Sequence, residues 1–583
     1  MGLGILEDRV MSHVPGTTRY FDDPQRPQIA HDGAPGLKCD YSGGVPIILI
    51  PQPSDDPNDP LNWPLWRRDL ICFILSVSAI FATALGPILA ANTITLSLWF
   101  EVDFTKVALL TGYFLLGVGF AGTFFVPSSR IWGKRHAFIF GICLLIASSV
   151  WAGSVNRNYT SMLWARIIQG VGAAPFEALV NASVGDLYFV HQRGKRMAFT
   201  NLAVFGGSFF TPILVGKITH TIYWWWTFYL VAIFCGACLP AIILFCPETA
   251  FNRDAALNTD TADTDVIGAD ASRVVQVDAD GAAAMAMADG ANKDEIDPSD
   301  PCDSSGNDEE KAAAEATAGR SGAIPAKKTW LQNLAPFDGR KSDENFIKLL
   351  LRPFPLFLQP AFLWASLTQG TLIGWTVFIG VIMAQFFLGY PLWWDEVKTG
   401  YAYTGAFLGA VLGFIIAGLL ADWSAKFLTR RNKGIYEPEF RLVLVIPQLV
   451  FGVMGLYGFG ITIDGMMKLK YHWSVPLVFF GFEVCGMIIG AVASSLYIVD
   501  AYRDLAIEGF TCLIIFKNFF SYGLTYKAYD WLEENGSRGR PVFNALGSVQ
   551  LVICLLAIPM YVFGKRNRSF FHRHDLLKMF GLR

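Results

Sequence analysis

The sequence contains twelve separate stretches of about 20 mostly apolar residues, and this feature limits the folds that the chain can adopt. A helix needs roughly 20 residues to cross about 30 Å of hydrocarbon, and it satisfies its own backbone hydrogen bonds in lipid. Of the 583 residues, 53% are hydrophobic and 16% are charged, whereas soluble chains average about 25% charged residues. We therefore predict an all-α, multi-pass membrane protein with twelve transmembrane helices.

The apolar stretches form two groups of six, separated by a long polar segment. The predicted spans are residues 69–91, 106–127, 136–155, 161–184, 198–219 and 224–246, then 361–386, 400–421, 442–463, 474–499, 507–526 and 542–563. The intervening segment is rich in Ala, Asp, Glu, Ser and Gly, so it cannot bury enough apolar area to offset its ordering entropy. We predict a cytosolic tail (1–68), a six-helix bundle (69–246), a disordered cytosolic linker (254–352), a second six-helix bundle (353–563) and a cytosolic tail (564–583).

Basic residues gather in the loops on one side of the predicted spans. Arg130, Lys134 and Arg135 follow the second span, and similar groups follow the fourth, eighth and twelfth spans. Because cytoplasmic loops carry an excess of Lys and Arg, we expect this side and both termini to be cytosolic. We expect the membrane to be the plasma membrane, and a vacuolar address is the alternative. The sequons at Asn158 and Asn535 then fall in outer loops and are candidate glycosylation sites.

The two halves share an internal repeat. Asp186-Leu187-Tyr188 at the end of the fourth span matches Asp500-Ala501-Tyr502 at the end of the tenth. Repeated halves are typical of transporter folds whose substrate site lies between the halves.

Three short segments that flank the predicted spans have distinctive sequences: residues 56–64 (Asp-Pro-Asn-Asp-Pro-Leu-Asn-Trp-Pro), 247–249 (Pro-Glu-Thr) and 432–442, which begins Asn-Lys-Gly-Ile-Tyr. They resemble segments of the major facilitator superfamily and, within it, of the fungal twelve-span drug:proton antiporter family with its histidinol and polyamine transporter relatives. The resemblance implies two pseudo-symmetric bundles that rock about a central cavity.

The fourth span carries a charged motif. Residues 163–174, which include Arg166 and Gln169, are similar to the family's Arg-containing motif, whose Arg is associated with proton coupling. An Arg within a span must be paired or hydrated. Glu177 follows eleven residues after Arg166, which returns it to nearly the same helix face, so Arg166, Gln169 and Glu177 are expected to share a cavity face. Alternatively, Arg166 ties helices together through backbone carbonyls.

A segment of the fifth span resembles a motif that permits a kink. Residues 207–216, with Gly207, Pro212 and Gly216, are similar to the antiporter motif, although Thr211 and Val215 replace two of its glycines. Pro212 permits a kink where the halves rock, but the lost glycines weaken an inference of export, and a packing kink without bearing on direction is the alternative.

The loop after the second span resembles the superfamily's gating motif. It keeps the basic cluster with Gly133, Lys134 and Arg135, but Arg130 stands where the usual Asp lies. The second half keeps its acid as Asp422. Two alternatives therefore remain for the basic cluster of the first half. It forms a charge latch for gating, or it is a solvated basic anchor on the cytosolic side.

Other polar residues interrupt the later spans. Charge at the bilayer centre costs at least about 2.5 kcal/mol, so Glu483, Lys517 and Asn518 are expected to face the protein interior. Glu483 is a candidate titrating or cation-binding carboxylate, and structural pairing with Lys517 is its alternative. Glu508 lies near a predicted membrane boundary, where we expect it to face headgroups or water.

The resemblance and the repeated halves lead us to expect a secondary transporter. No P-loop appears in the sequence, so direct ATP drive is unsupported, and no intramembrane cluster of His and acids has metal-ligand spacing, so we do not expect an enzyme. Proton-coupled efflux of amphipathic compounds is the first hypothesis. Proton-coupled uptake of organic cations such as polyamines and a non-transporting nutrient sensor are the alternatives. We expect the partners to be a small-molecule substrate, protons and the lipid bilayer, with no nucleic acid, no cofactor and no metal, and we expect a monomer.

Overall fold

The computed structural model describes residues 3–11, 14–19, 39–40, 47–49, 51, 53–252, 327–432, 435–502 and 505–582. The chain divides into two units, one of residues 1–21, 64–252 and 330–583 and one of residues 22–63 and 253–329. Most of the predicted linker therefore lies outside the described residues, and its disorder stays a prediction.

The smaller unit contains short elements. Strand β2 (Cys39–Asp40) pairs antiparallel with β3 (Ile47–Ile48). Helix η1 (Pro60–Asn62) is capped by Asp59, whose carboxylate accepts hydrogen bonds from the backbone N–H of Leu61 at 3.0 Å and of Ser54 at 3.1 Å. By accepting the Leu61 N–H, the carboxylate satisfies a backbone donor that the start of a helix leaves unpaired.

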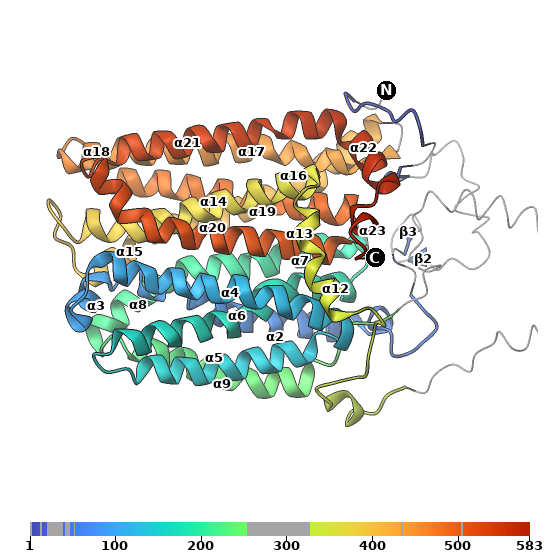
Figure 1. Cartoon of the computed structure of the whole chain (residues 1–583), viewed down its shortest axis with the longest axis horizontal. Coiled ribbons are helices and arrows are strands. Elements are labelled where there is room, and N and C mark those ends of the chain that lie inside the picture. The colour runs from blue at the N-terminus through green and yellow to red at the C-terminus, as the bar shows by residue number, and fades with distance from the viewer. Residues whose placement is uncertain are drawn as a thin grey trace, which may run out of the picture. The chain divides into compact units, whose positions relative to one another are not determined.

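The larger unit holds two helical bundles, which lie side by side in Figure 1. The first, here the N-bundle, comprises α2 (Leu65–Ala84), η2 (Pro87–Leu89), α3 (Thr93–Phe100), α4 (Phe104–Trp132), α5 (Arg135–Gly153), α6 (Tyr159–Leu187), α7 (Val190–Asn201), η3 (Leu202–Gly206), α8 (Gly207–Thr221) and α9 (Trp226–Phe245). The fifth predicted span is α7, η3 and α8 in succession, and η3 is a π-helical turn within it.

The second bundle, here the C-bundle, repeats this plan. It comprises α14 (Pro360–Phe387), α15 (Glu396–Ala402), α16 (Thr404–Arg431), η6 (Pro438–Leu444), α17 (Val445–Gln448), η7 (Leu449–Val453), α18 (Met454–Met467), α19 (Ser474–Ala501), α20 (Ala506–Glu534), α21 (Gly539–Leu555) and α22 (Ala557–Arg573). The remaining elements are β1 (Thr18–Arg19), η5 (Gln332–Leu334), α12 (Phe346–Leu351), α13 (Pro353–Leu356), β4 (Ile435–Tyr436) and α23 (Leu576–Met579).

All twelve predicted spans coincide with long helical segments, and the all-α fold is confirmed. Among the described residues, ten helical segments are long and apolar enough to cross a membrane. The other two are α2, which begins with Arg67, Arg68 and Asp69, and α20, which carries Lys517 at its middle. Large apolar side chains such as Phe120, Leu408 and Leu419 are exposed on the bundle surface, as expected where the surroundings are lipid.

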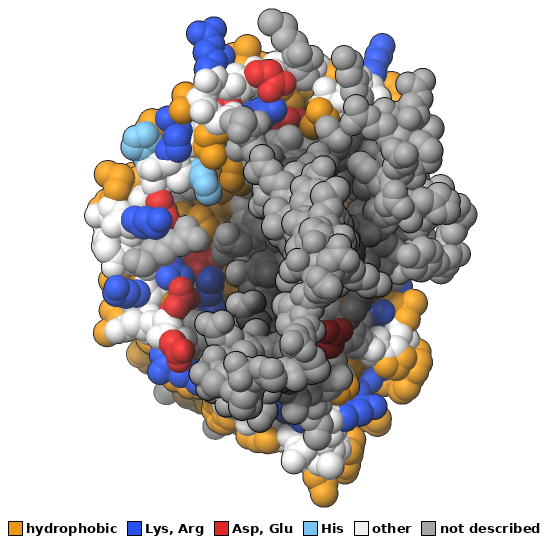
Figure 2. All heavy atoms as spheres, turned by 90° about the vertical axis from the view of Figure 1, so that its right-hand side faces the viewer, with side chains coloured by type: hydrophobic (Ala, Val, Ile, Leu, Met, Phe, Trp, Pro, Cys, Tyr) orange, Lys and Arg blue, Asp and Glu red, His pale blue; other side chains and the backbone are white. Residues whose placement is uncertain are grey.

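Both ends of the chain lie at one end of the bundles (Figure 1). Figure 2 shows this face, on which Lys and Arg side chains are spread with acidic side chains between some of them. This distribution is the one that loop charge predicted, although the side of the membrane on which it lies stays a prediction.

The N-terminal segment packs on the C-bundle, which the sequence did not predict. Strand β1 pairs antiparallel with β4, and the Leu6 N–H donates to the Val562 carbonyl at 3.0 Å. The Arg568 guanidinium joins Glu437 and Glu439, each at 2.9 Å, and also donates to the Pro15 carbonyl. The N-terminal segment is thus held by the bundle that lies farther along the chain.

The described end of the predicted linker forms regular structure, so the predicted disordered segment extends too far toward the C-terminus. Residues 332–334 and 346–351 form η5 and α12, and the backbone N–H of Lys341 donates to the Ile131 carbonyl at 2.6 Å. The Phe337 ring stacks on His136 with centroids 5.1 Å apart. Aromatic residues after residue 329 give this segment ring contacts with the N-bundle, which the preceding acidic stretch cannot make because it has no aromatic residues.

Candidate functional site

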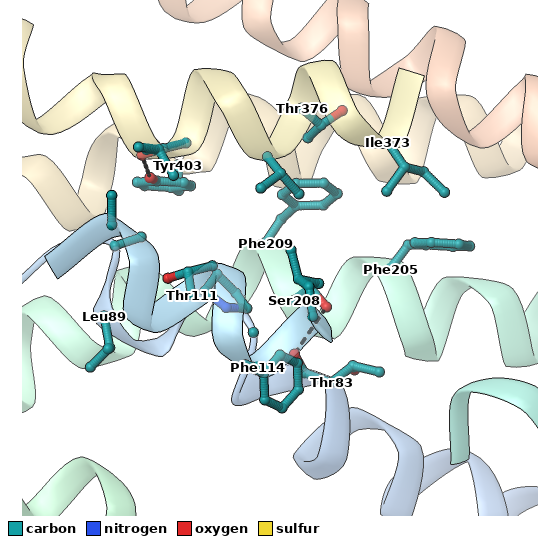
Figure 3. A pocket seen from close by; sticks show the side chains of 18 of the residues that line it. Thr83, Leu89, Thr111, Phe114, Phe205, Ser208, Phe209, Ile373, Thr376 and Tyr403 are labelled. Carbon is teal, nitrogen blue, oxygen red and sulfur yellow. Dashed lines mark hydrogen bonds between the residues drawn. The ribbon is translucent and has the colours of Figure 1, made fainter. Parts of the chain in front are cut away.

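A cavity of about 160 Å³ lies between the two bundles. Its walls come from α2, η2, α3, α4, α6, η3 and α8 on one side and from α14, α19 and α20 on the other, with Tyr403 between α15 and α16. Figure 3 shows Thr83, Phe114 and Ser208 on one wall and Ile373 and Thr376 on the opposite wall. We call this space the inter-bundle cavity.

The cavity wall is mostly apolar and aromatic. Phe114, Phe205, Phe209, Phe480, Tyr403 and Tyr529 contribute rings to it. Thr83, Thr111 and Ser208, which carry hydroxyl groups, also line the cavity. An apolar wall with a few polar groups is the composition of small-molecule sites in general.

One ion pair crosses the cavity from bundle to bundle. The Lys517 ammonium of α20 pairs with the Glu177 carboxylate of α6, and the two side chains are 8% and 11% exposed. The ammonium also lies 5.7 Å from the centre of the Phe205 ring, within cation–π range. Lys517 therefore pairs with Glu177, and the alternative that it pairs with Glu483 was wrong.

Glu483 is completely buried on α19 and bonds instead to a hydroxyl of α14. The Thr376 Oγ1 lies 2.8 Å from Oε1 and 2.9 Å from Oε2 of Glu483. Thr376 lines the cavity and Glu483 lies behind it. The sequence identified Glu483 because an acid in an apolar span is conspicuous, whereas a threonine there is not.

Arg166 is fully buried and lies behind the cavity wall, where it contacts Gly86 of that wall. Its guanidinium donates to the carbonyls of Leu85 at 2.7 Å, Gly86 at 3.2 Å and Leu110 at 3.1 Å, and to Gln169 Oε1 at 2.9 Å. These contacts tie α6 to α4 and to the end of α2, which is the alternative stated for this residue. Glu177 lines the cavity, whereas Arg166 and Gln169 do not, so the expectation that the three share a cavity face was wrong.

The fifth-span motif packs against the C-bundle at the end of the molecule away from the termini. A Cβ at Gly216 would overlap the Glu396 carbonyl, and a Cβ at Gly400 would lie 2.5 Å from the Pro212 carbonyl. Gly207 packs against Ile80 of α2 instead. Pro212 and Gly216 therefore lie where α8 and α15 approach closely, one from each bundle.

Helices α4 and α20 pack along the cavity from one bundle to the other. A Cβ at Gly119 would lie 3.1 Å from the Asn518 Cβ, and one at Gly122 would lie 3.1 Å from Ile514. Asn518 lines the cavity and donates to the Ile514 carbonyl at 3.1 Å. Small residues on α4 let the two backbones approach, as in other helix pairs in lipid.

An ionic cluster joins the bundles at the end where the termini lie. Arg130 of α4 pairs with Glu508 of α20 and, at 3.2 Å, with Glu344; Arg352 pairs with Glu344 at 2.7 Å and with Glu508 at 3.4 Å. We call these four residues the arginine–glutamate cluster. The expectation that Glu508 faces headgroups or water was wrong, because its side chain is 4% exposed and held by two arginines.

The rest of the gating segment is held within the N-bundle. Gly133 has φ +88°, and a Cβ there would overlap the Glu248 carboxylate. That carboxylate accepts the backbone N–H groups of Lys134 at 2.9 Å and Arg135 at 3.0 Å. The Lys134 ammonium pairs with Asp186 at 2.5 Å.

The repeated acids of the two halves have equivalent partners. Asp186 at the end of α6 pairs with Lys134 before α5, and Asp500 at the end of α19 pairs with Arg441 at 2.9 Å, before the ninth span. Asp422 is exposed near the end of α16. The repeat seen in the sequence therefore corresponds to one ion pair in each half.

The remaining predicted positions lie away from the cavity. Asn158 caps α6 by accepting the Ser161 N–H at 3.1 Å, and the Asn535 amide donates to the Trp531 carbonyl at 2.8 Å. Both lie at the end opposite the termini, and their glycosylation stays a prediction. Within the described ranges, no group of three His, Cys, Asp or Glu could hold a metal ion.

Comparisons with known proteins show which family and which solved structures this chain is similar to. The profile of the Major Facilitator Superfamily matches residues 71–504. Protein HOL1 of Saccharomyces cerevisiae is 26% identical over 91% of this chain and 91% of its own, and the multidrug transporter TPO1_2 of Candida glabrata is 24% identical over 95% and 85%. The proton:xylose symporter XylE aligns over 86% of this chain and 96% of its own with a TM-score of 0.54 and 12% identity, which indicates a shared fold.

Proposed function

Because the chain belongs to the Major Facilitator Superfamily, it is a membrane transporter, and we propose that it uses a proton gradient to export amphipathic organic molecules through the inter-bundle cavity. The Glu177–Lys517 ion pair carries this proposal, because it joins the two bundles across an otherwise apolar cavity. A transporter of this kind needs a charged contact that changes when the bundles move.

The chemistry of the cavity supports an amphipathic substrate. Aromatic rings accept apolar parts of a ligand, and the hydroxyls of Thr83, Thr111 and Ser208 offer hydrogen bonds to its polar part. One relative, TPO1_2 of Candida glabrata, is named a multidrug transporter, which agrees with this chemistry.

The ion pair supports proton coupling for an electrostatic reason. A buried ion pair is stable only while both partners are charged, and loss of either charge leaves the other unpaired in a low dielectric. A proton on Glu177, or a charged substrate beside it, would release Lys517 and weaken the contact between the bundles. Arg166 would keep the floor of the cavity in place, and the termini would lie in the cytosol at the plasma membrane.

Proteoliposomes containing the full-length chain test this function. Uptake of rhodamine 6G, spermidine and benzoate is measured with an imposed pH gradient, without one, and with a protonophore. We expect at least one probe, and rhodamine 6G first, to be transported at a rate that follows the gradient and falls to the level of protein-free liposomes with the protonophore. A transport rate that does not depend on the pH gradient would contradict proton coupling. If spermidine is the one transported probe and it moves in the same direction as the protons, the function is uptake of organic cations and not export.

A further inference from the structure

Within the described structure, the fully buried Glu483 has one hydrogen-bonding partner, the hydroxyl of Thr376. Both carboxylate oxygens lie within 2.9 Å of Thr376 Oγ1. Thr376 and Met487 line the inter-bundle cavity, and Glu483 does not. Thr376 therefore lies between the Glu483 carboxyl group and the cavity, and its hydroxyl faces the carboxyl group.

A hydroxyl in this place can satisfy Glu483 in either protonation state. When Glu483 is ionised, the Thr376 O–H donates to a carboxylate oxygen. When Glu483 is protonated, its own O–H donates to Thr376 Oγ1, and the hydroxyl donates to the Leu372 carbonyl, which is 2.9 Å away. A hydroxyl is one donor and two acceptors, so no heavy atom needs to move between the two states.

The charged groups around α19 leave Glu483 without an ionic partner among the described residues. On the elements that pack against α19, Lys517 of α20 is held by Glu177, and the others lie toward the ends of the bundle: Asp422, Lys426, Arg430, Arg431, Glu439, Arg441, Asp464, Glu508, Lys527, Asp530, Glu533 and Glu534. A carboxyl group in such a place depends on its hydrogen-bond partner for the stability of its charged form.

We propose that Thr376 is the positioning residue through which Glu483 exchanges a proton with the cavity, an inference that rests on the proton coupling proposed above. In the step, a hydronium ion in the cavity gives a proton to Thr376 Oγ1 while the Thr376 hydroxyl proton passes to a Glu483 oxygen, which leaves water, an intact hydroxyl and a neutral acid. Glu483 returns the proton by the reverse step. Because Thr376 satisfies both forms, helices α14 and α19 stay joined while the charge changes.

Infrared difference spectroscopy of the full-length chain in lipid nanodiscs, titrated with pH, tests the inference without a transported substrate. We expect a carboxylic acid carbonyl band that titrates in the wild type and is lost in Glu483→Gln. Thr376→Val should displace the midpoint by about one pH unit or more, a tenfold change in the protonation equilibrium, because the charged form loses its donor. Thr376→Ser should keep the wild-type midpoint.

Thr371→Val is the matched control. Thr371 lies on the same helix, is buried, and bonds to the Leu367 carbonyl at 2.6 Å and Gln550 Oε1 at 2.8 Å, but it does not line the cavity. The inference is overturned if Thr376→Val titrates as Thr371→Val does, or if no Glu483-dependent band titrates while the protein stays folded. A Thr376-dependent midpoint in a protein whose flux ignores the pH gradient supports the assignment and removes the proposed coupling.

Discussion

Glu177 and Lys517 were both recognisable in the sequence, but their pairing was not. A charged residue in an apolar span is conspicuous because its burial is costly. Its partner, however, depends on how each helix is rotated and on which helices are neighbours. Lys517 turns toward Glu177 of the other bundle, whereas Glu483 turns toward Thr376 of its own. Thr376, Thr83 and Thr111 had no signal at all, since threonine is unremarkable in a span.

The ion pair leads to a double-mutant prediction. Glu177→Gln should lower the free energy of unfolding by on the order of 3 kcal/mol, because it leaves a buried ammonium unpaired. Glu177→Gln with Lys517→Met should restore most of that loss, because no charge then remains unpaired. Tryptophan fluorescence during unfolding in mixed detergent and dodecyl sulfate micelles measures both effects.

A surface pair provides the control for this cycle. Lys527 and Asp530 form an exposed ion pair with a 3.4 Å separation, so Lys527→Ala should change stability by less than about 1 kcal/mol. A double variant as unstable as the sum of its two single variants would contradict the role of the pair.

The elements were predicted well where length and apolarity define them. Every predicted span overlaps a long helical segment, but the π-helical turns η3 and η7 and the short helices α3 and α15 were not predicted. These elements depend on contacts between helices more than on periodicity. Motif residues Pro212 and Gly216 pack against α15, an element with no signal of its own in the sequence.

Close packing of α8 and α15 leads to a second prediction. Gly216→Ala should lower the flux of the transported probe and the free energy of unfolding, the latter by about 1–3 kcal/mol, because its Cβ would overlap the Glu396 carbonyl. Gly418→Ala on α16 is the control, since a Cβ there meets nothing within 4 Å. Equal flux and stability for the two variants would show that the close approach is unimportant.

At the scale of the whole molecule, the fold class and the two-bundle plan followed from the sequence, and the ties between the bundles did not. Ionic contacts between the bundles, such as Arg130 with Glu508 or Lys517 with Glu177, leave no periodic trace in the sequence. The acidic and aromatic residues of 327–352 also belong to these ties, so the described end of the predicted linker is part of the structure.

The arginine–glutamate cluster leads to a prediction about conformation. Glu508→Gln should separate the bundles at the end where the termini lie, because Arg130 and Arg352 then lose a shared carboxylate that is 4% exposed. Spin labels at Phe245 and Trp423, one on each bundle, should report a larger fraction of long distances by double electron–electron resonance. Asp343→Asn, which removes an exposed acid, is the control and should leave the distribution unchanged.

The most direct test of the account is whether the two ends of the molecule open in alternation during transport. Spin-label pairs at Phe245 and Trp423, near the end with the termini, and at Trp151 and Leu469, near the other end, are measured in nanodiscs with and without the transported probe at two pH values. We predict that one pair shifts toward long distances as the other shifts toward short ones, and that Glu177→Gln reduces the dependence of both distances on pH. Distances that stay fixed at both ends while the same preparation transports the probe would contradict a path between the bundles.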